Sequence, residues 1–427
     1  MERVKSNIPF VGLHAHSVAG SIFDAIGYPQ EHMNYAYENG CSALALTDHG
    51  NMNGLAHQVL HAKKMKEEGR EFKPIFGCEA YFLPSLEEWH AEYEDSKNQK
   101  SKRKKKQDKT SGTTIEDEGA SKKAINNILN RRRHLILLAQ NQKGLNNLFK
   151  IISRSYKPTN FYRYPRIDYD LLSEHSEGII AASACLGGVY AGDYWENLEA
   201  GEEAILAAMR ATTEKMMSIF GDRWYGELQW NSVPDQHRLN KYILKMREEY
   251  GISVISTADS HYPSPDAWKD RELYKRLGWL GKAHDDASEL PGSVDEIGYE
   301  LYPKNGDQMW ESYLKYSHDL GEEYDDDVVL QSITETHYIA HELIEDFMPS
   351  AEVRLPDFVV PAGVSEVAAL TKMCIEGLRT KSLSENDIYV ERLKKELYVI
   401  KDRGFSKYFL TMKAIADVAN DLMLTGT

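Results

Sequence analysis

Residues 12–17 read Gly-Leu-His-Ala-His-Ser and follow the first apolar run of the chain, residues 8–11. The two histidines, His14 and His16, are two positions apart, and on an extended segment such side chains point to the same side. Two neutral imidazoles directed at one point can chelate a divalent metal ion. An isolated pair of this kind is more often an ordinary surface feature, so a metal centre requires further ligands elsewhere in the chain.

The length of the chain indicates a globular protein of two or three domains, because 427 residues exceed the size of one ordinary domain. The sequence contains no run of about 18 apolar residues, the length that a membrane-spanning helix needs. Residues 1–7 also lack the apolar core of a signal peptide. Four irregularly spaced cysteines make no disulfide framework, so we expect a reducing, cytoplasmic setting. The net charge of −15 argues against a free-standing binder of duplex DNA. It is compatible with a nucleic-acid enzyme whose acidic metal pocket works beside a basic partner domain.

Short apolar segments recur up to about residue 261, with helix-like segments such as Pro29–Asn39, Leu55–Glu68 and Gln236–Tyr250 between them. This alternation predicts a parallel α/β arrangement, either a barrel or an open sheet. In both forms the active site gathers at the carboxyl ends of the strands. The strands that we expect are Phe10–Leu13, Ala43–Leu46, Lys73–Phe82, His134–Ala139, Gly178–Ala182, Trp224–Gln229 and Ser253–Ser256.

Two regions depart from this rhythm. Residues 87–133 form an insert with five consecutive basic residues at 102–106, which is typical of a disordered, solvated loop. Contact with a phosphate backbone or docking of a partner is the alternative for this insert. Beyond residue 264 longer helices are expected, at Ala267–Lys282, Asp307–Tyr316, Thr334–Phe347, Val364–Leu378 and Val390–Asp402. We therefore divide the chain into a domain over 8–265, a helical connecting region over 266–350 and a final region over 351–427.

Side chains that can bind metal stand at six of the seven predicted strands. Each motif alone is weak, but Asp259 and His261 repeat the spacing of His14 and His16 at the far end of the same domain. Core packing does not explain His, Asp, Glu or Cys at six strand ends, so we predict a shared metal centre. The motifs contain His14, His16 and Asp24, then Asp48 and His49, Cys78 and Glu79, His134, Cys185, and finally Asp259 and His261.

From about Phe10 to Tyr262 the chain resembles the polymerase and histidinol phosphatase (PHP) domain that opens the alpha subunit of bacterial DNA polymerase III, a C-family replicative polymerase. The final third is similar to the segment that leads into that polymerase's palm, most clearly at Arg403–Leu410, so residues 351–427 are interpreted as an incomplete start of a palm. The motifs that carry the PHP resemblance are Leu13–Ser17, Ala43–Asn51, Lys73–Tyr81, Pro165–Asp168, Cys185–Gly188 and Asp259–Tyr262.

The resemblance implies a distorted seven-stranded β/α barrel that holds two or three divalent metal ions. Mixed nitrogen, oxygen and sulfur ligands suit Zn²⁺, Mn²⁺ or Fe²⁺ better than Mg²⁺. One departure from the family pattern is that Asp24-Ala25 replaces the usual Asp-Gly, about one residue further from His16 than expected. Carried over position by position, the implied ligands are His14, His16, Asp24, His49, Glu79, His134, Cys185, Asp259 and His261.

The activity that the resemblance implies is phosphodiester hydrolysis, as in a metal-dependent 3′–5′ proofreading exonuclease acting on single-stranded 3′ ends. Glu79 is expected to bridge two ions about 3.5–4 Å apart, and either the third ion or Arg166 is expected to neutralise phosphate oxygens. Asp259 and His261 complete the expected catalytic set. Asp48, next to His49, is expected either to orient an imidazole from outside the ligand set or to cap a helix.

The sequence lacks both the Gly-Ser loop and the Pro-Asp-x-Asp-x-Asp carboxylate set that the palm of this family uses, and Asp325–Asp327 is interpreted as an acidic loop. We therefore expect an N-terminal polymerase part, from a split gene or a cut chain, that does not polymerise alone. It would need a partner polypeptide carrying the palm, fingers and clamp-binding region. Two alternatives stay open: a free-standing phosphoesterase of the histidinol-phosphatase type, and a metal-braced domain that only docks a separate exonuclease.

Overall fold

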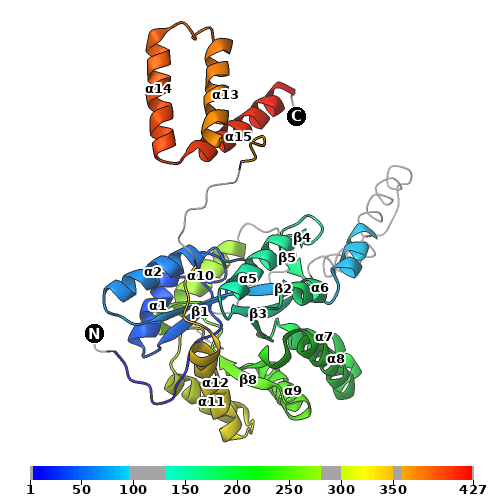
Figure 1. The fold of residues 1–427 in the computed structure, drawn as a ribbon. Coiled ribbons are helices and arrows are strands. Elements are labelled where there is room, and N and C mark those ends of the chain that lie inside the picture. The colour runs from blue at the N-terminus through cyan, green and yellow to red at the C-terminus, as the bar shows by residue number, and fades with distance from the viewer. Residues whose placement is uncertain (1–2, 96–130, 280–299, 350–357, 426–427) are drawn as a thin grey trace. The chain divides into compact units, whose positions relative to one another are not determined.

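A computed structural model describes residues 3–95, 131–279, 300–349 and 358–425 (Figure 1). The chain falls into two compact units, Met1–Pro349 and Ser350–Thr427, which are described separately. The basic residues 102–106 of the predicted insert lie outside the described residues. A helix over 86–95 buries Trp89, and β3 begins at Arg133, so both ends of that region are structured, in contrast to the predicted disorder.

One curved sheet forms the centre of the first unit (Figure 1). Its strands follow the order β4-β5-β2-β3-β6-β7-β8, and β1 pairs with β2 as well. All six strands predicted beyond residue 40 are present with bounds within one residue, whereas the hairpin β4–β5 was not predicted. The strands are β1 Ala43–Leu46, β2 Lys73–Phe82, β3 Arg133–Ala139, β4 Phe161–Tyr162, β5 Tyr164–Ile167, β6 Ile179–Ala182, β7 Trp224–Gln229 and β8 Ser253–Thr257.

The N-terminal segment closes this sheet into a ring. Gly12 bridges to Leu44 of β1, and Ala15 bridges to Ser260, just beyond β8. A distorted barrel of seven members therefore forms, which confirms the predicted fold class. Its members are the N-terminal segment and strands β1, β2, β3, β6, β7 and β8. The predicted strand Phe10–Leu13 is wrong as a continuous strand. The segment lies between β1 and the end of β8 and makes only one bridge to each of them.

The predicted parallel arrangement is wrong at β3, which runs antiparallel to both β2 and β6. The pairs β1–β2, β6–β7 and β7–β8 are parallel, as expected. Because β3 is reversed, its amino end lies beside the carboxyl end of β2, and His134 is paired with Tyr81. A histidine that opens a strand thus reaches the same edge of the sheet as residues that end the other strands.

Helices cover the outside of the barrel (Figure 1). In α9, Leu239, Ile243 and Met246 recur at helical spacing and are buried. Gly226 of β7 permits this approach, because a Cβ atom there would lie 2.5 Å from the Ile243 side chain. The barrel helices are α1 Pro29–Glu38, α2 Leu55–Glu67, α5 Gln142–Ser155, α6 Tyr169–His175, α7 Val189–Asn197, α8 Glu202–Phe220 and α9 Pro234–Tyr250, and short 3₁₀ turns cover Leu198–Ala200 and Gly221–Arg223.

The described residues between 266 and 349 belong to the same compact unit as the barrel. Thr336 of α12 accepts a hydrogen bond from the backbone of Val11, the start of the closing segment, at 3.1 Å. The predicted helix Thr334–Phe347 is wrong in both bounds, because α12 begins earlier and continues into a single π turn. The elements here are the 3₁₀ turn Pro265–Ala267, α10 Trp268–Trp279, α11 Gly306–Leu320, α12 Asp326–Tyr338 and the π turn Ile339–Leu343.

The interpretation of Asp325–Asp327 as an acidic loop is wrong, because these residues begin α12. The Asp325 side chain accepts hydrogen bonds from the backbone N–H groups of Asp327 and Val328 and caps the helix. Asp326 and Asp327 lie in the first turn, where the helix dipole favours negative charge.

The second unit contains α13 Glu366–Thr380, α14 Asp387–Asp402 and α15 Ser406–Thr425. Its core is small, since only Ala369, Leu370 and Leu410 form a buried apolar cluster among the residues described there. Among the described residues of the whole chain, no helix combines the length and apolarity needed to cross a membrane.

Substituting His32 is expected to reduce the acid sensitivity of the barrel unit. Burial lowers the pKa of His32 to about 4. Its Nδ1 atom is buried and has no hydrogen-bond partner among the described residues. Between pH 6.5 and 4 the unfolded chain therefore takes up a proton that the folded one does not, which removes up to about 3 kcal/mol of folding free energy. We expect His32→Gln to lose less stability over this range in urea titrations with EDTA.

The matched control for this measurement is His318→Gln, because the His318 side chain is 92% exposed. That variant should follow the wild-type dependence on pH. An identical loss of stability in wild type and His32→Gln would show that His32 is protonated in the folded state.

Candidate metal centre

Four buried side chains converge where the closing segment meets β2 and the end of β8. The Nε2 atoms of His14 and His16 lie 3.0 Å apart, as the period-two motif predicted for side chains on one face. Oδ1 of Asp259 lies 3.1 Å and 3.2 Å from these nitrogens, and Oε2 of Glu79 lies 2.8 Å and 3.6 Å from them. A tetrahedral ion with bonds of about 2.0–2.1 Å spaces its ligands by roughly 3.3 Å. These four atoms fit such an ion.

Glu79 also faces a second group of imidazoles. Its other oxygen, Oε1, lies 2.8 Å from Nδ1 of His49 and 2.7 Å from Nδ1 of His134. The Glu79 side chain is fully buried. Burial alone would raise its pKa, but the imidazoles of His134 and His49 hold that pKa well below its usual value. The carboxylate therefore offers one charged oxygen to each group, which is how a residue bridges two cations.

The third group lies at the outer side of the cluster. The ligand atoms of His16, His49 and His261 lie within 4.8 Å of one another. Oδ2 of Asp24 lies 3.1 Å from Nε2 of His49 and 3.5 Å from Nε2 of His261. Asp24 is thus brought to the cluster despite the longer gap in its motif.

Cys185 joins the cluster through His134, with its Sγ atom 3.6 Å from Nδ1 of that imidazole. Burial, together with Asp259 and Glu79, raises the pKa of the Cys185 thiol well above its usual value. A nearby cation has the opposite effect and favours the thiolate. All nine side chains predicted as ligands are therefore brought together.

Asp259 shows most clearly that the cluster suits a cation. Its backbone is in the left-handed region (φ +48°), which Asp adopts more readily than most residues. Its Oδ1 atom is buried and has no aligned hydrogen-bond donor among the described residues, although nitrogens of His14 and His16 lie within 3.2 Å. Carboxylate oxygens and imidazole nitrogens can bind a divalent metal ion through their lone pairs. Here such atoms lie close together although no hydrogen bond pairs Asp259 Oδ1 with them.

Glu227 of β7 supports His14 and was missed by sequence reasoning. Its Oε1 atom lies 2.7 Å from Nδ1 of His14 and accepts hydrogen bonds from Gln229 and Thr257. With a proton on Nδ1, the lone pair on Nε2 points to the cluster. The sequence did contain a signal, because Glu227 is a charged residue inside the predicted strand Trp224–Gln229, and a carboxylate that such a strand buries needs a partner.

Arg271 of α10 was missed as well. Its Nε donates to the backbone oxygen of Asp24 at 2.7 Å, and its Nη2 donates to Asp24 Oδ1 at 2.6 Å. The second carboxylate oxygen of Asp24 is left to face the imidazoles. Arg271 and Asp24 are 247 positions apart in the sequence, and no local sequence pattern predicts their contact.

Among the described residues, Asp48 makes no direct hydrogen bond to an imidazole and caps no helix. It accepts hydrogen bonds from the backbone and hydroxyl groups of Ser17 and from the hydroxyl of Ser21. It therefore fixes the loop that leads from His16 to Asp24. The predicted helix-capping role is therefore wrong. The link to an imidazole runs through Ser21, whose hydroxyl lies 3.4 Å from Nδ1 of His16.

Arg166 is placed differently from the prediction. Its guanidinium donates to the backbone carbonyls of Arg131, Tyr162 and Tyr164 and lies over the ring of Trp89, 4.4 Å from the centroid. The residue is fully buried. These contacts hold β5 and the segment before β3 together and leave a phosphate-neutralising role without support.

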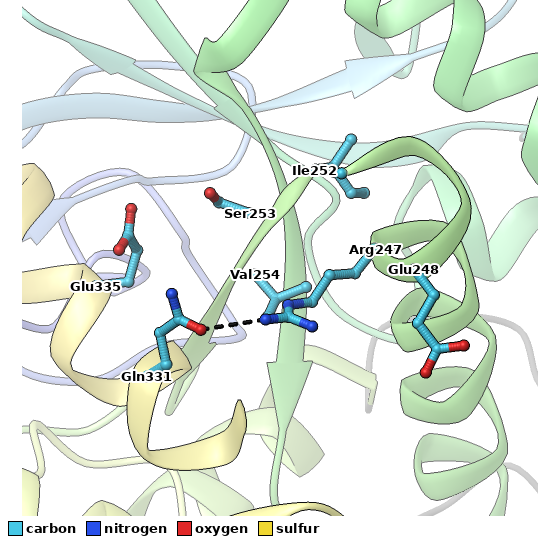
Figure 2. A pocket seen from close by; sticks show the side chains of 8 residues that line it. Arg247, Glu248, Ile252, Ser253, Val254, Gln331 and Glu335 are labelled. Carbon is cyan, nitrogen blue, oxygen red and sulfur yellow. Dashed lines mark hydrogen bonds between the residues drawn. The ribbon is translucent and has the colours of Figure 1, made fainter. Parts of the chain in front are cut away.

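The cluster opens into a cavity of about 300 Å³ lined by Asp24, Cys185, Gln236, Arg271 and Leu301, among others. A cavity of about 400 Å³ lies at the opposite end of β8, where Figure 2 shows Arg247 donating to Gln331 at 3.1 Å. Among the described residues, each group that could hold a metal ion includes at least two residues that line the first cavity. The carboxyl end of the barrel is therefore the candidate site.

Comparison with known proteins agrees with this geometry. The profile of the PHP domain matches residues 12–231, and the profile described as bacterial DNA polymerase III alpha NTPase domain matches residues 368–425. DNA polymerase III subunit alpha of Aquifex aeolicus is 30% identical over 95% of this chain, and that of Campylobacter jejuni is 27% identical over 96%. The chain spans about 31% of the length of each of these relatives.

Among solved structures, a putative metal-dependent phosphoesterase from Bifidobacterium adolescentis aligns with 61% of this chain and 91% of its own. The two are 15% identical, with a TM-score of 0.30.

Proposed function

We propose that this chain, which belongs to the PHP domain family, hydrolyses phosphodiester bonds at its buried cluster with two or three divalent ions. The proposed substrate is the 3′ end of single-stranded DNA. The observation that carries the proposal is the position of Glu79, whose two carboxylate oxygens face separate groups of imidazoles. Phosphodiester hydrolysis commonly uses two ions held at such a distance that one carboxylate can bridge them.

In this proposal neighbouring ion positions share ligands, Glu79 through its two oxygens and His49 through its two ring nitrogens. When bound, the ions would activate a water molecule and neutralise charge on the phosphate oxygens. Zn²⁺, Mn²⁺ or Fe²⁺ are favoured, because the donor set mixes nitrogen, oxygen and sulfur. The first position would be held by His14, His16, Glu79 and Asp259, the second by Glu79, His49, His134 and Cys185, and the third by Asp24, His49 and His261.

Asp259 and His261 are the groups that a substrate phosphate would meet. Both line the cavity, and the imidazole Nδ1 of His261 lies 2.7 Å from the backbone oxygen of Asp259. That contact fixes the turn after β8, so the two side chains keep their direction toward the cluster. Arg166 has no part in this proposal.

The larger setting follows from the relatives, which are subunits of a replicative polymerase and much longer than this chain. We propose that the chain is the N-terminal part of such a polymerase and acts in DNA replication in the cytoplasm. Synthesis would require the palm, fingers and clamp-binding region, because the palm carboxylates are absent from this sequence. The chain alone should not polymerise.

A comparison of two substrates tests the proposed reaction. The chain would be supplied with Mn²⁺, Zn²⁺ or Fe²⁺ and offered either 3′-labelled single-stranded DNA or histidinol phosphate. We expect release of labelled nucleotides and slow or absent phosphate release. Faster hydrolysis of histidinol phosphate would favour a free-standing phosphatase, and bound metal without any DNA cleavage would favour a bracing role.

Replacing Glu227 with Gln is expected to weaken metal binding about 10- to 100-fold, the usual effect of losing a group that orients a metal-binding imidazole. The change removes the charge that fixes the His14 tautomer while it keeps the shape of the side chain. Competition with a fluorescent chelator measures the affinity for Zn²⁺.

Glu249→Gln serves as the control, because Glu249 pairs with Arg210 at the surface. Equal affinity of wild type and Glu227→Gln would show that Glu227 does not act through His14.

A further inference from the structure

An aromatic pair lies beside the candidate metal centre. Phe23 directly precedes Asp24, and its ring stacks on that of Tyr274 in α10, with centroids 5.3 Å apart and an interplanar angle of 29°. Phe23 is 53% exposed, and Leu273 and Leu277 of the same helix are exposed as well.

The backbone of Phe23 is held in an unusual conformation. Its φ angle of +64° lies in the left-handed region, which bulky residues seldom adopt. Strain of this kind persists where surrounding contacts impose it, and it is concentrated at functional sites. Here the strained residue is Phe23, whose ring is exposed and which directly precedes the predicted ligand Asp24.

One face of α10 fixes the position of this ring. Arg271, Tyr274 and Gly278 are spaced so that they share a helix face. Arg271 holds Asp24 through two hydrogen bonds. Gly278 allows the close approach, because a Cβ atom there would lie 2.7 Å from the Cβ of Phe23. The same helix thus sets both the aromatic pair and one predicted ligand.

The charge of α10 suits an anionic ligand. Its sequence, Trp-Lys-Asp-Arg-Glu-Leu-Tyr-Lys-Arg-Leu-Gly-Trp, contains four basic and two acidic side chains, whereas the whole chain has a net charge of −15. Proteins that bind single-stranded nucleic acids combine basic side chains with aromatic rings on which bases stack.

We propose that Phe23 and Tyr274 form a stacking platform for the terminal base of a single-stranded nucleic acid whose phosphodiester enters the metal centre. A nucleotide carries its base and its phosphate on one sugar. Phe23 and Asp24 are consecutive residues, and both contact α10, Phe23 through Tyr274 and Asp24 through Arg271. In the proposal, a base stacked on Phe23 would place the phosphate of the same nucleotide toward the cluster. The inference rests on the proposed hydrolysis of single-stranded DNA and adds a preference for ends that carry a base.

The variants are chosen so that they fold. Phe23→Gly removes the ring and relieves the left-handed backbone, which Gly adopts without cost. Phe23→Trp keeps an aromatic surface. Phe161→Ala is the matched control, since Phe161 is 40% exposed and stacks on Tyr156 in a pair elsewhere on the surface.

The first readout is binding in EDTA of a single-stranded oligonucleotide with 2-aminopurine at its 3′ end, whose fluorescence is quenched by stacking. We expect quenching with wild type, Phe23→Trp and Phe161→Ala. We expect binding roughly 5- to 150-fold weaker with Phe23→Gly. Absence of quenching with wild type, or equal binding by Phe23→Gly, would overturn the platform.

The second readout is cleavage with Mn²⁺ of oligonucleotides that end either in an ordinary nucleotide or in an abasic sugar. Wild type should prefer the end with a base through a lower KM, and Phe23→Gly should lose that preference. Equal cleavage of both ends by wild type would refute the platform while the proposed hydrolysis stands. Quenching without cleavage under Mn²⁺, Zn²⁺ or Fe²⁺ would support the platform and refute the hydrolysis.

Discussion

Glu79→Gln is expected to remove at least one divalent ion from the cluster and to reduce hydrolysis of 3′-labelled single-stranded DNA by roughly 10³-fold or more. The carboxylate is fully buried and faces two groups of imidazoles with its two oxygens. An amide of the same shape offers one neutral oxygen and a nitrogen that cannot bind a cation. Metal content by mass spectrometry and the rate of nucleotide release measure the two effects.

The control for this substitution is Glu177→Gln, because Glu177 is 74% exposed and pairs only with Lys143 among the ion pairs described. It should bind metal and cleave DNA like wild type. Cleavage by Glu79→Gln within a factor of three of wild type would exclude a bridging carboxylate at this position.

Removal of metal is expected to destabilise the barrel unit by about 4 kcal/mol for each ion that is present at a thousand times its dissociation constant. The cluster joins the closing segment, β2, β3 and the turn after β8, through His14, Glu79, His134 and Asp259. Bound ions would therefore tie both sides of the seam where the barrel closes.

Thermal unfolding followed by circular dichroism, with and without EDTA, measures this effect. The midpoint should fall by several degrees on chelation and recover when Mn²⁺ or Zn²⁺ is added back. Glu79→Gln should show a smaller shift, because it begins with fewer ions. Equal midpoints for wild type in EDTA and in metal would mean that the ions do not stabilise the fold.

Local patterns predicted most strands and the convergence of the cluster. The bounds of β1, β2 and β7 were predicted without error, because buried strands are short apolar runs with clear ends. The period-two argument placed His14 and His16 on one side, and their Nε2 atoms are 3.0 Å apart.

Strand direction and long-range contacts were not predictable in this way. β3 follows a long connection, and the residue pattern of β3 does not predict that this strand runs antiparallel to β2. The contact between Arg271 and Asp24 depends on how α10 packs, which the tertiary fold alone decides. Arg166 lies in a recognisable motif, but a motif does not show where its guanidinium points. In the structure the guanidinium donates to backbone carbonyls and lies over the ring of Trp89.

The most direct test of the proposed function is a titration of Mn²⁺ into metal-free protein, with bound ions counted and nucleotide release from 3′-labelled single-stranded DNA followed in the same samples. We predict at least two ions per chain, with cleavage that begins only as the second ion binds and is lost in Asp259→Asn. Two or more bound ions without cleavage, under Mn²⁺ and equally under Zn²⁺ and Fe²⁺, would contradict a phosphodiesterase centre.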